Sequence, residues 1–301
     1  MINIKKKIYA VPIVIISGLI WSFGPLVVRN IDEPNILIWQ YLFARGLTIF
    51  LILNLYLFYS EGKKFYKNYL NTSLSSFVGG TFLGFGMICF IVSITNTSAA
   101  ITLLCLAAMP FVTALLGFFL LKEIISLKLF FSIIVASVGI VIMSLDQSSV
   151  SSKTGLVFGL LSAFCFAIFS VSLRWKKKAP TFSTVAFAGL TCVIMSLLVI
   201  IINDFELISS LKNQFLFSLH GILVCSGLIL YSIGSRFLPA AELALLSLIE
   251  VVGGVLWVWL PIFGINEVPS YYAIVGGSLI VISIIFYSYI IKKNSKFVLF
   301  N

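Results

Sequence analysis

Charged residues are scarce in this chain, and their scarcity excludes most soluble folds. Only 10% of the 301 residues are Asp, Glu, Lys or Arg, whereas hydrophobic residues make up 60%. Soluble domains carry about 25% charged and roughly 45–50% apolar residues. The composition therefore indicates a membrane protein that lies in a lipid bilayer.

Sequence motifs for metals, disulfides and ATP are also missing. The chain has one histidine and ten acidic residues, which offer few metal ligands, and its five cysteines form no Cys-x-x-Cys pair. No Gly-x-x-x-x-Gly-Lys-Ser/Thr loop is present to hold the phosphates of ATP. We therefore expect no cofactor and no bound metal, and the absence of the loop argues against an ATP-driven pump.

Long apolar runs are abundant. Runs of about 20 residues, enough to cross ~30 Å of hydrocarbon as a helix, follow one another along the sequence. Alternating strand patterns are not seen, which leaves the helix as the spanning structure. The first run is too long for a cleaved signal peptide, so we expect it to be retained. We predict ten membrane-spanning helices over residues 8–28, 36–59, 74–95, 99–121, 127–145, 155–173, 184–203, 217–235, 240–263 and 271–291.

The two halves of the chain share a sequence pattern. Residues 86–110 read GMICFIVSITNTSAAITLLCLAAMP, and residues 227–251, which begin 141 positions later, read GLILYSIGSRFLPAAELALLSLIEV. Each copy leads to a Glu-x-x-Ser sequence that starts at Glu123 or Glu267. Two related halves are typical of secondary transporters. We predict an all-α membrane protein built from two five-helix repeats, residues 1–147 and 154–293, with a polar joint over residues 146–153.

The basic residues indicate how the chain is oriented. Because five is an odd number of spans, the second repeat inserts upside down relative to the first. With the N-terminus in the cytoplasm, sixteen of the twenty basic residues lie on the cytoplasmic side, three lie on the other side and Arg45 lies inside a span. The positive-inside rule therefore places both termini in the cytoplasm, and the net charge of +10 is explained without a nucleic-acid partner.

Four passages resemble the EamA family of the drug/metabolite transporter superfamily. They are residues 21–25 (WSFGP), Arg45 within residues 42–47, residues 120–126 (LLKEIIS) and residues 248–270. The resemblance covers residues 8–291 and implies an inner-membrane carrier of small metabolites that is not an enzyme. It also implies a central cavity lined by spans one, three, four, six, eight and nine, with alternating access through rocking of the halves.

The resemblance also sets two structural expectations. We expect the third and fourth spans to face the eighth and ninth. The stretch between Val251 and Glu267 is three residues longer than its counterpart between Pro110 and Glu123. The outer end of the ninth span is therefore expected to be kinked or lengthened near residues 261–263.

Glu250 is the first candidate for a substrate-binding residue. It lies about ten residues into the ninth span, where an ionised carboxylate costs about 2.5–3.5 kcal/mol on insertion scales. Helical spacing places Ser247, two glycines and Trp257 on or near its face, and Trp257 could supply an aromatic wall. Glu250 either binds a substrate ammonium group or a proton, or is a neutral packing residue bonded to neighbouring helices.

Arg45 is the deepest basic residue, about halfway along the second span. A buried guanidinium group needs a partner or a water-filled cavity. A substrate carboxylate, Glu250 or carbonyl groups at a helix end would serve. Because the second span is peripheral in the family that the chain resembles, we expect a structural or gating role, and direct substrate contact is the alternative.

Aromatic residues offer a second kind of binding surface. Trp21 and Tyr231 lie in spans expected to be central, and Phe90 occupies the repeat position that matches Tyr231. Such residues could form a box around an organic cation, although packing is the ordinary role of an aromatic residue in this chain. We expect the single histidine, His220, to be a packing residue.

The remaining features describe substrate and partners. One intramembrane acid with hydroxyl groups and aromatic residues suits an amino-acid-like, amphipathic or quaternary-ammonium solute, with proton coupling at the acid. We expect Glu123 and Glu267 to bond to helix ends or loop cations, ahead of the helices that Ser126 and Ser270 are placed to cap.

Two glycine motifs, residues 80–84 and 155–159, permit close helix contacts within one subunit or between the subunits of a homodimer. The competing functions are a membrane-embedded lipid-modifying enzyme and a non-transporting scaffold. An enzyme would need a cluster of acids, histidines or metal ligands, which one histidine and one intramembrane acid do not form.

Overall fold

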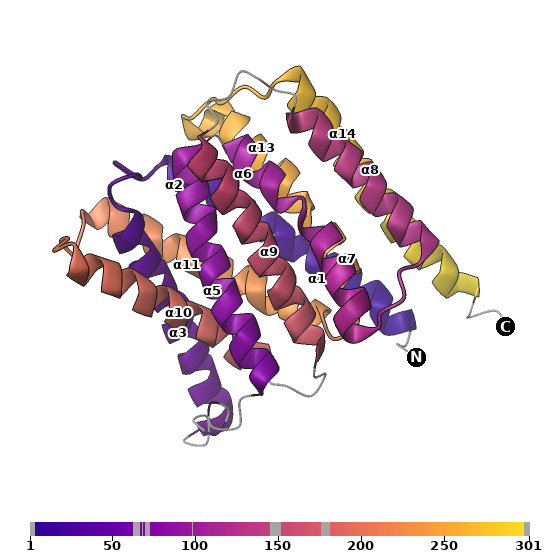
Figure 1. Cartoon of the computed structure of the whole chain (residues 1–301), viewed down its shortest axis with the longest axis horizontal. Helices are drawn as coiled ribbons and strands as arrows, with labels where there is room; N and C mark the ends of the chain where they lie inside the picture. Colours follow the sequence, from indigo (N-terminus) through magenta and orange to yellow (C-terminus); the bar gives the residue numbers. More distant parts are fainter. Residues whose placement is uncertain are drawn as a thin grey trace.

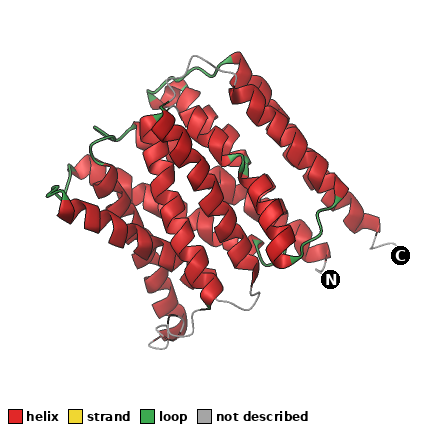
Figure 2. Cartoon of the chain, viewed as in Figure 1, coloured by secondary structure: helices red, strands yellow, loops and turns green. Residues whose placement is uncertain are grey.

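The computed structural model is all-helical over the residues it describes, which are 4–62, 67, 69, 73–97, 99–144, 152–175 and 181–297 (Figures 1 and 2). The predicted all-α class is therefore confirmed. The helices are α1 Ile4–Trp21, α2 Gly24–Arg29, α3 Ile38–Glu61, α5 Leu74–Asn96, α6 Ala99–Leu106, α7 Met109–Leu121, α8 Leu127–Ser144, α9 Lys153–Trp175, α10 Thr181–Ile202, α11 Leu211–Gly234, α12 Ala240–Ser247, α13 Ile249–Trp259, the 3₁₀ turn η2 Pro261–Phe263, and α14 Tyr271–Phe297.

Eight helical segments of the described chain are long and apolar enough to cross a membrane, and they correspond to the predicted spans one to four and six to nine. Two further apolar helices, Leu127–Gly139 within α8 and Ile274–Ile290 within α14, are shorter. The division into ten spans therefore stays a prediction. The polar joint at residues 146–153 lies almost wholly outside the described residues.

Three of the spans are broken near their middle. The first divides into α1 and α2 around Ser22, the fourth into α6 and α7 around Ala107, and the ninth into α12 and α13 at Leu248. Ala107 and Leu248 are 141 residues apart, the spacing of the two sequence copies. The fourth and ninth spans are thus broken at equivalent positions.

Local sequence accounts for these breaks. Pro25 and Pro110 lie in the first two positions of α2 and α7, where a missing backbone N–H costs nothing. At the ninth-span break there is no proline, and the Ser247 hydroxyl instead donates to the Ala244 carbonyl oxygen at 3.0 Å. Side-chain bonds of this kind compete with the helical ladder and bend helices.

Most of the packing joins the N-terminal helices to the C-terminal ones. α5 packs on α9, α10 on α3 and α1 on α11, and α8 and α14 lie side by side at the right of Figure 1. The fourth and ninth spans touch through α6 with α13 and α7 with α12, as expected. The expectation that the third span faces the eighth was wrong, because α5 packs mainly on α9 and α10 and α11 mainly on α1 and α3.

Glycine explains why α5 approaches α9 and α10 so closely. A Cβ atom on Gly80 would lie 2.5 Å from the Thr184 carbonyl oxygen in α10, and one on Gly159, in α9, would lie 3.0 Å from Ser93 Oγ in α5. Both glycine motifs of the sequence therefore mediate contacts within the chain.

The ninth span ends earlier than predicted. α13 stops at Trp259, and Leu260 is extended, as expected for a residue that precedes a proline. The residues from Pro261 to Phe263 form the 3₁₀ turn η2, and Gly264 follows with a φ of 77°. The three additional residues of the second repeat thus form a turn beyond the helix.

Candidate functional site

A small cavity lies at the level where the broken spans change direction. Trp21 ends α1, Leu106 ends α6 and Glu250 is the second residue of α13, and all three line it. The space measures about 40 Å³. The full lining consists of Trp21, Arg45, Met87, Phe90, Leu106, Phe166, His220, Val224 and Glu250.

A second, smaller space of about 10 Å³ adjoins the first and shares Trp21 and Glu250 with it. Ser247 and Met109 also line this space, so the two residues that follow the breaks at equivalent repeat positions, Met109 and Glu250, face the same region. Together the spaces hold only a few water molecules. The described side chains therefore nearly fill this region in the present conformation.

The carboxyl group of Glu250 faces the cavity. Glu250 lies in the first turn of α13, where the helix dipole favours a negative charge. Within the described part of the chain, its carboxyl group forms neither a hydrogen bond nor an ion pair. Among the described residues, no bond therefore joins the Glu250 carboxyl group to a neighbouring helix, as the packing interpretation requires.

The two glycines beside Glu250 serve helix packing. A Cβ atom on Gly253 would lie 2.6 Å from Ser22, and one on Gly254 would lie 2.7 Å from Leu103. These positions bring α13 against the break of the first span and against α6. The space beside both glycines is filled by other atoms of the protein, which leaves no room for a ligand.

Arg45 also lines the cavity and is only 2% exposed. One of its terminal nitrogens lies 3.5 Å from the Met87 carbonyl oxygen, a long contact, and its guanidinium carbon lies 5.5 Å from the centroid of the Tyr41 ring. Its Nε–H has no acceptor among the described residues, and no ion pair there joins it to Glu250. The second span, expected to be peripheral, thus contributes a buried cation whose charge is not paired with an acid.

His220 lies beside Arg45 and lines the same cavity, which sequence reasoning missed. It is 2% exposed, its Nδ1 is hydrogen-bonded to the Tyr41 hydroxyl, and its ring stacks on Tyr41 at 5.7 Å and 18°. Helical spacing could have found it, because residues 220, 224, 227 and 231 share one face of α11. The same face carries Val224, another lining residue.

Trp21 forms one wall of the cavity. Its indole N–H donates to the Val224 carbonyl oxygen at 3.3 Å, and its ring meets Phe166 edge-on at 5.6 Å. The indole lies directly on Gly227, where a Cβ atom would be 2.2 Å from Nε1. Only glycine at position 227 allows Trp21 to take this place.

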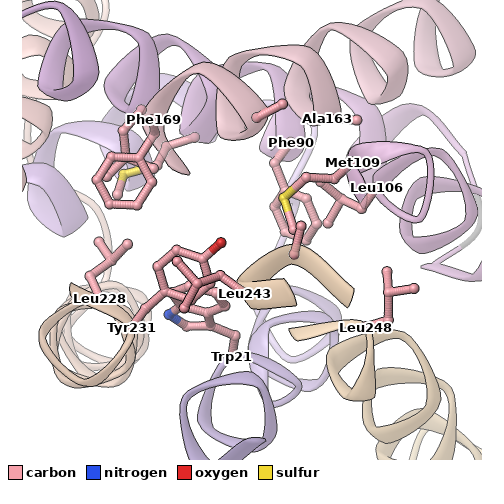
Figure 3. Packing of buried hydrophobic residues seen from close by; sticks show 14 of the residues in the cluster. Trp21, Phe90, Leu106, Met109, Ala163, Phe169, Leu228, Tyr231, Leu243 and Leu248 are labelled. Carbon is pink, nitrogen blue, oxygen red and sulfur yellow. The ribbon is translucent and has the colours of Figure 1, made fainter. Parts of the chain in front are cut away.

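Phe90 and Tyr231, the matching repeat positions, have different surroundings. Phe90 lines the cavity, whereas Tyr231 lies behind Trp21 and is fully buried (Figure 3). The Tyr231 hydroxyl is hydrogen-bonded to Ser170 at 2.7 Å, and its ring lies 5.3 Å from that of Trp21. Tyr231 was expected to line the cavity and instead supports Trp21 from behind.

Trp257 does not line the cavity either. Its indole N–H donates to Ser22 Oγ at 2.8 Å, and its ring stacks on Phe23 at 4.4 Å. Trp257 therefore fixes α13 to the break in the first span, one to two turns away from Glu250. The predicted aromatic wall is formed by Trp21, Phe90 and Phe166 instead.

A second acid is buried in the same span. Glu242, in the first turn of α12, is 5% exposed, and it interacts with the Tyr287 hydroxyl of α14. The prediction that Glu250 is the only acid inside a span was therefore wrong. Glu242 lies outside the cavity lining and contacts α14 through Tyr287.

Glu123 and Glu267 form ion pairs, as expected of acids that bond to cations or helix ends. Glu123 Oε1 accepts from Arg174 Nε at 3.0 Å, and its Oε2 accepts from the Ala240 backbone N–H at the start of α12 at 3.0 Å. Glu267 Oε1 accepts from Arg29 Nε at 2.8 Å. The expected cap at Ser126 is confirmed by a 3.2 Å bond from the Leu129 N–H.

Among the described residues, no group of three or more His, Cys, Asp or Glu side chains is placed to hold a metal ion. The site therefore consists of two ionisable side chains of opposite charge, one histidine and an aromatic wall.

Comparison with known proteins relates the chain to one family. Residues 7–145 match the sequence model of the EamA-like transporter family. This part of the chain is therefore similar to that family. The family is a branch of the drug/metabolite transporter superfamily, and its members are transporters rather than enzymes. The apolar helices and the family together identify a multi-pass membrane protein.

Structural comparison supports the fold over the whole EamA-like chain. Solved structures of 28 chains match it. One of them, a crystal structure, shares 18% sequence identity and has a TM-score of 0.71, with 95% of this chain and 98% of the other chain covered. No curated protein sequence matches the chain.

Proposed function

We propose that this EamA-like protein is a secondary transporter that carries an amino-acid-like solute by alternating access. The proposal rests on one cavity that is lined by an acidic and a basic side chain, Glu250 and Arg45, which form no ion pair with each other. A buried charge without a counter-charge is costly. A zwitterion supplies both missing partners at once, with its ammonium group at Glu250 and its carboxylate at Arg45.

The surroundings of the two charges suit the rest of such a solute. Trp21, Phe90 and Phe166 offer aromatic faces to an ammonium group or an apolar side chain. His220 lies beside Arg45, so its free ring nitrogen can bond to a carboxylate. A multiply phosphorylated substrate is disfavoured, because Arg45 is the only basic residue in the cavity lining.

Glu250 also offers a route to proton coupling. A carboxylate that holds a substrate ammonium group can bind a proton after the substrate leaves, so the two cations exchange at one group. Acidic pH should then weaken substrate binding, because protons compete with the ammonium group for Glu250. Replacement by glutamine removes this competition.

Helix packing supports the architecture that alternating access requires. We propose ten spans in two inverted repeats, residues 1–147 and 154–293. Exchanging each helix before residue 147 with its counterpart after residue 154 turns the pair α5–α9 into α11–α1. The same exchange turns the pair α10–α5 into α3–α11. All four helix pairs are in contact in the structure. Rocking of one repeat against the other would widen the cavity at one face and then at the other.

We propose that both termini of this protein lie on the cytoplasmic side of the inner membrane, as the positive-inside rule predicts. A cysteine placed in the loop at residues 176–178, which lies outside the described residues, provides the test. Labelling of that cysteine by an impermeant reagent from outside intact cells would overturn the topology.

A set of matched ligands tests the substrate class. Thermal stabilisation of the purified protein would be compared for an apolar amino acid, its amide, which lacks the carboxylate, and its decarboxylated amine. We expect the amino acid to stabilise most, with the carboxylate preference lost in Arg45→Gln and the ammonium preference lost in Glu250→Gln. Equal stabilisation by amino acid and amine would favour a cationic solute instead.

Movement of the bound solute into liposomes separates transport from the other functions. A lipid-modifying enzyme would convert the ligand, and a scaffold would leave it outside. We expect uptake of the unchanged solute, since the described residues contain no group of three or more His, Cys, Asp or Glu side chains placed to hold a metal ion.

A further inference from the structure

Two ion pairs at opposite ends of the bundle join the halves of the chain. Arg29, at the end of α2, pairs with Glu267 beyond η2, and Arg174, near the end of α9, pairs with Glu123 beyond α7. In Figure 1 the α2 end lies at the top of the bundle and the α7 end at the bottom. Each pair joins a residue before position 147 to one after position 154, so neither can persist if the halves separate at that end.

The two networks are related by the sequence repeat. In each, arginine Nε donates to the glutamate Oε1 of the other half, at 2.8 and 3.0 Å. In each, arginine Nη1 donates to a backbone carbonyl oxygen, that of Ile94 for Arg29 at 3.5 Å and that of Ser235 for Arg174 at 3.0 Å. Residues 94 and 235 are 141 positions apart, the spacing of the repeat. The same arginine atoms therefore donate to equivalent positions of the repeat in both halves.

Both networks reach the helix starts that lead to the cavity. Arg29 Nη2 lies 3.4 Å from the Thr97 carbonyl oxygen, two residues before α6, and Glu123 accepts from Ala240, the first residue of α12. α6 and α12 are the halves of spans four and nine that run toward the breaks around the cavity. An ion pair at either end thus fixes one of the two segments that would have to move.

From these contacts we infer that Arg29–Glu267 and Arg174–Glu123 are a pair of gates that close the transport cavity at the two membrane faces. Loss of one pair favours the conformation that is open at that face, and the intact pair at the other end keeps the far side closed. The inference rests on the proposed transport function for its purpose. The closure of one cavity at two opposite ends can be tested without a substrate.

The two gates differ in burial. The side chains of Arg174 and Glu123 are 5% and 17% exposed, whereas those of Arg29 and Glu267 are 22% and 39% exposed. Ion pairs that are removed from water lose more when one partner is neutralised. The gate at Arg174 should therefore hold more firmly than the gate at Arg29.

Sided cysteine labelling tests the gates. A Val224→Cys change places a reporter on the cavity wall, and an impermeant maleimide is applied to right-side-out and to inside-out membrane vesicles. We expect Glu123→Gln to raise the labelling rate from one side, and Glu267→Gln to raise it from the other. The rise should be roughly tenfold, because a charge-assisted hydrogen bond exceeds a neutral one by about 1.4 kcal/mol.

Two controls accompany the experiment. Asp32→Asn breaks the exposed ion pair between Asp32 and Lys212, which also joins the two halves, and should leave the rates unchanged because its partners are 56% and 59% exposed. Proteins without Val224→Cys report labelling of the five native cysteines. If a glutamine variant fails to fold, Arg29→Lys and Arg174→Lys replace it, since lysine keeps the charge and loses the bonds to the carbonyl groups.

The outcomes separate the gates from the transport proposal. Opposite-sided increases for the two variants support the gates, whether or not a solute is transported. Unchanged rates, or increases from the same side for both variants, overturn the gates, even if amino-acid binding persists.

Discussion

The contact between Trp21 and Gly227 offers a sharp test of how the cavity wall is built. In Gly227→Ala, the new methyl group would lie 2.2 Å from Trp21 Nε1 and 2.6 Å from Cδ1, where ordinary contacts are 3.4–4 Å. The indole must therefore move by about 1 Å or more. It would lose its bond to the Val224 carbonyl oxygen and enter a space of only about 40 Å³.

The energetic cost follows from these distances. Overpacking of a buried site costs about 1–3 kcal/mol, and the lost hydrogen bond about 0.5–1.5 kcal/mol. The better helix propensity of alanine stabilises the folded variant by up to about 1 kcal/mol. We expect a net loss of about 1–3 kcal/mol in stability and a roughly tenfold weaker substrate affinity, since the displaced indole occupies the binding space.

Thermal unfolding of the detergent-solubilised protein and ligand titration measure the two effects. Gly277→Ala is the matched control, because its methyl group would meet its nearest neighbour, Val252, at 3.9 Å and should leave both quantities unchanged or raise stability slightly. A second change, Trp21→Phe, replaces the indole of the Gly227→Ala protein by the smaller phenyl ring and should recover stability. Wild-type stability and affinity in Gly227→Ala alone would refute the proposed wall.

Three further variants test contacts outside the cavity lining. Tyr231→Phe removes the hydroxyl group bonded to Ser170 and should cost about 1 kcal/mol of stability with little change in substrate affinity, because Tyr231 lies behind the wall; a large loss of affinity would place it in the cavity. Glu123→Ala should destabilise by about 3 kcal/mol and Glu267→Ala by about 1 kcal/mol, because the first pair is more buried and also binds the Ala240 N–H. Equal losses in thermal unfolding would contradict this ranking.

The sequence predicts the helices well because apolar length and turn residues are local properties. It also identifies Glu250, since an acid deep inside an apolar run stands out without knowledge of packing. Spacing along a helix, however, predicts on which face of the helix a residue lies. It does not predict what the side chain contacts at that level of the bundle. Trp257 shares a stripe with Glu250 but contacts Ser22, at the break of the first span, instead of the cavity.

Other parts of the site depend on how distant helices pack. Arg45 reaches the cavity although the second span was expected to be peripheral, and His220 meets Tyr41 across 179 positions of sequence. Repeat symmetry predicts Phe90 and Tyr231 as equivalent. The bulk of Trp21 breaks that symmetry, because its indole covers Gly227 and hides Tyr231. This asymmetry results from one large side chain and cannot be predicted from the repeat pattern of the sequence.

The central claim is that Glu250 and Arg45 bind the two ends of one transported solute. The most direct test is flux of a zwitterionic amino acid into liposomes that contain wild-type, Glu250→Gln or Arg45→Gln protein, followed from mildly acidic to mildly alkaline pH. The account predicts wild-type flux that falls at acidic pH, and folded variants that have each lost most of their flux, with no pH dependence left in Glu250→Gln. Wild-type rates and an unchanged pH profile in both variants would contradict it.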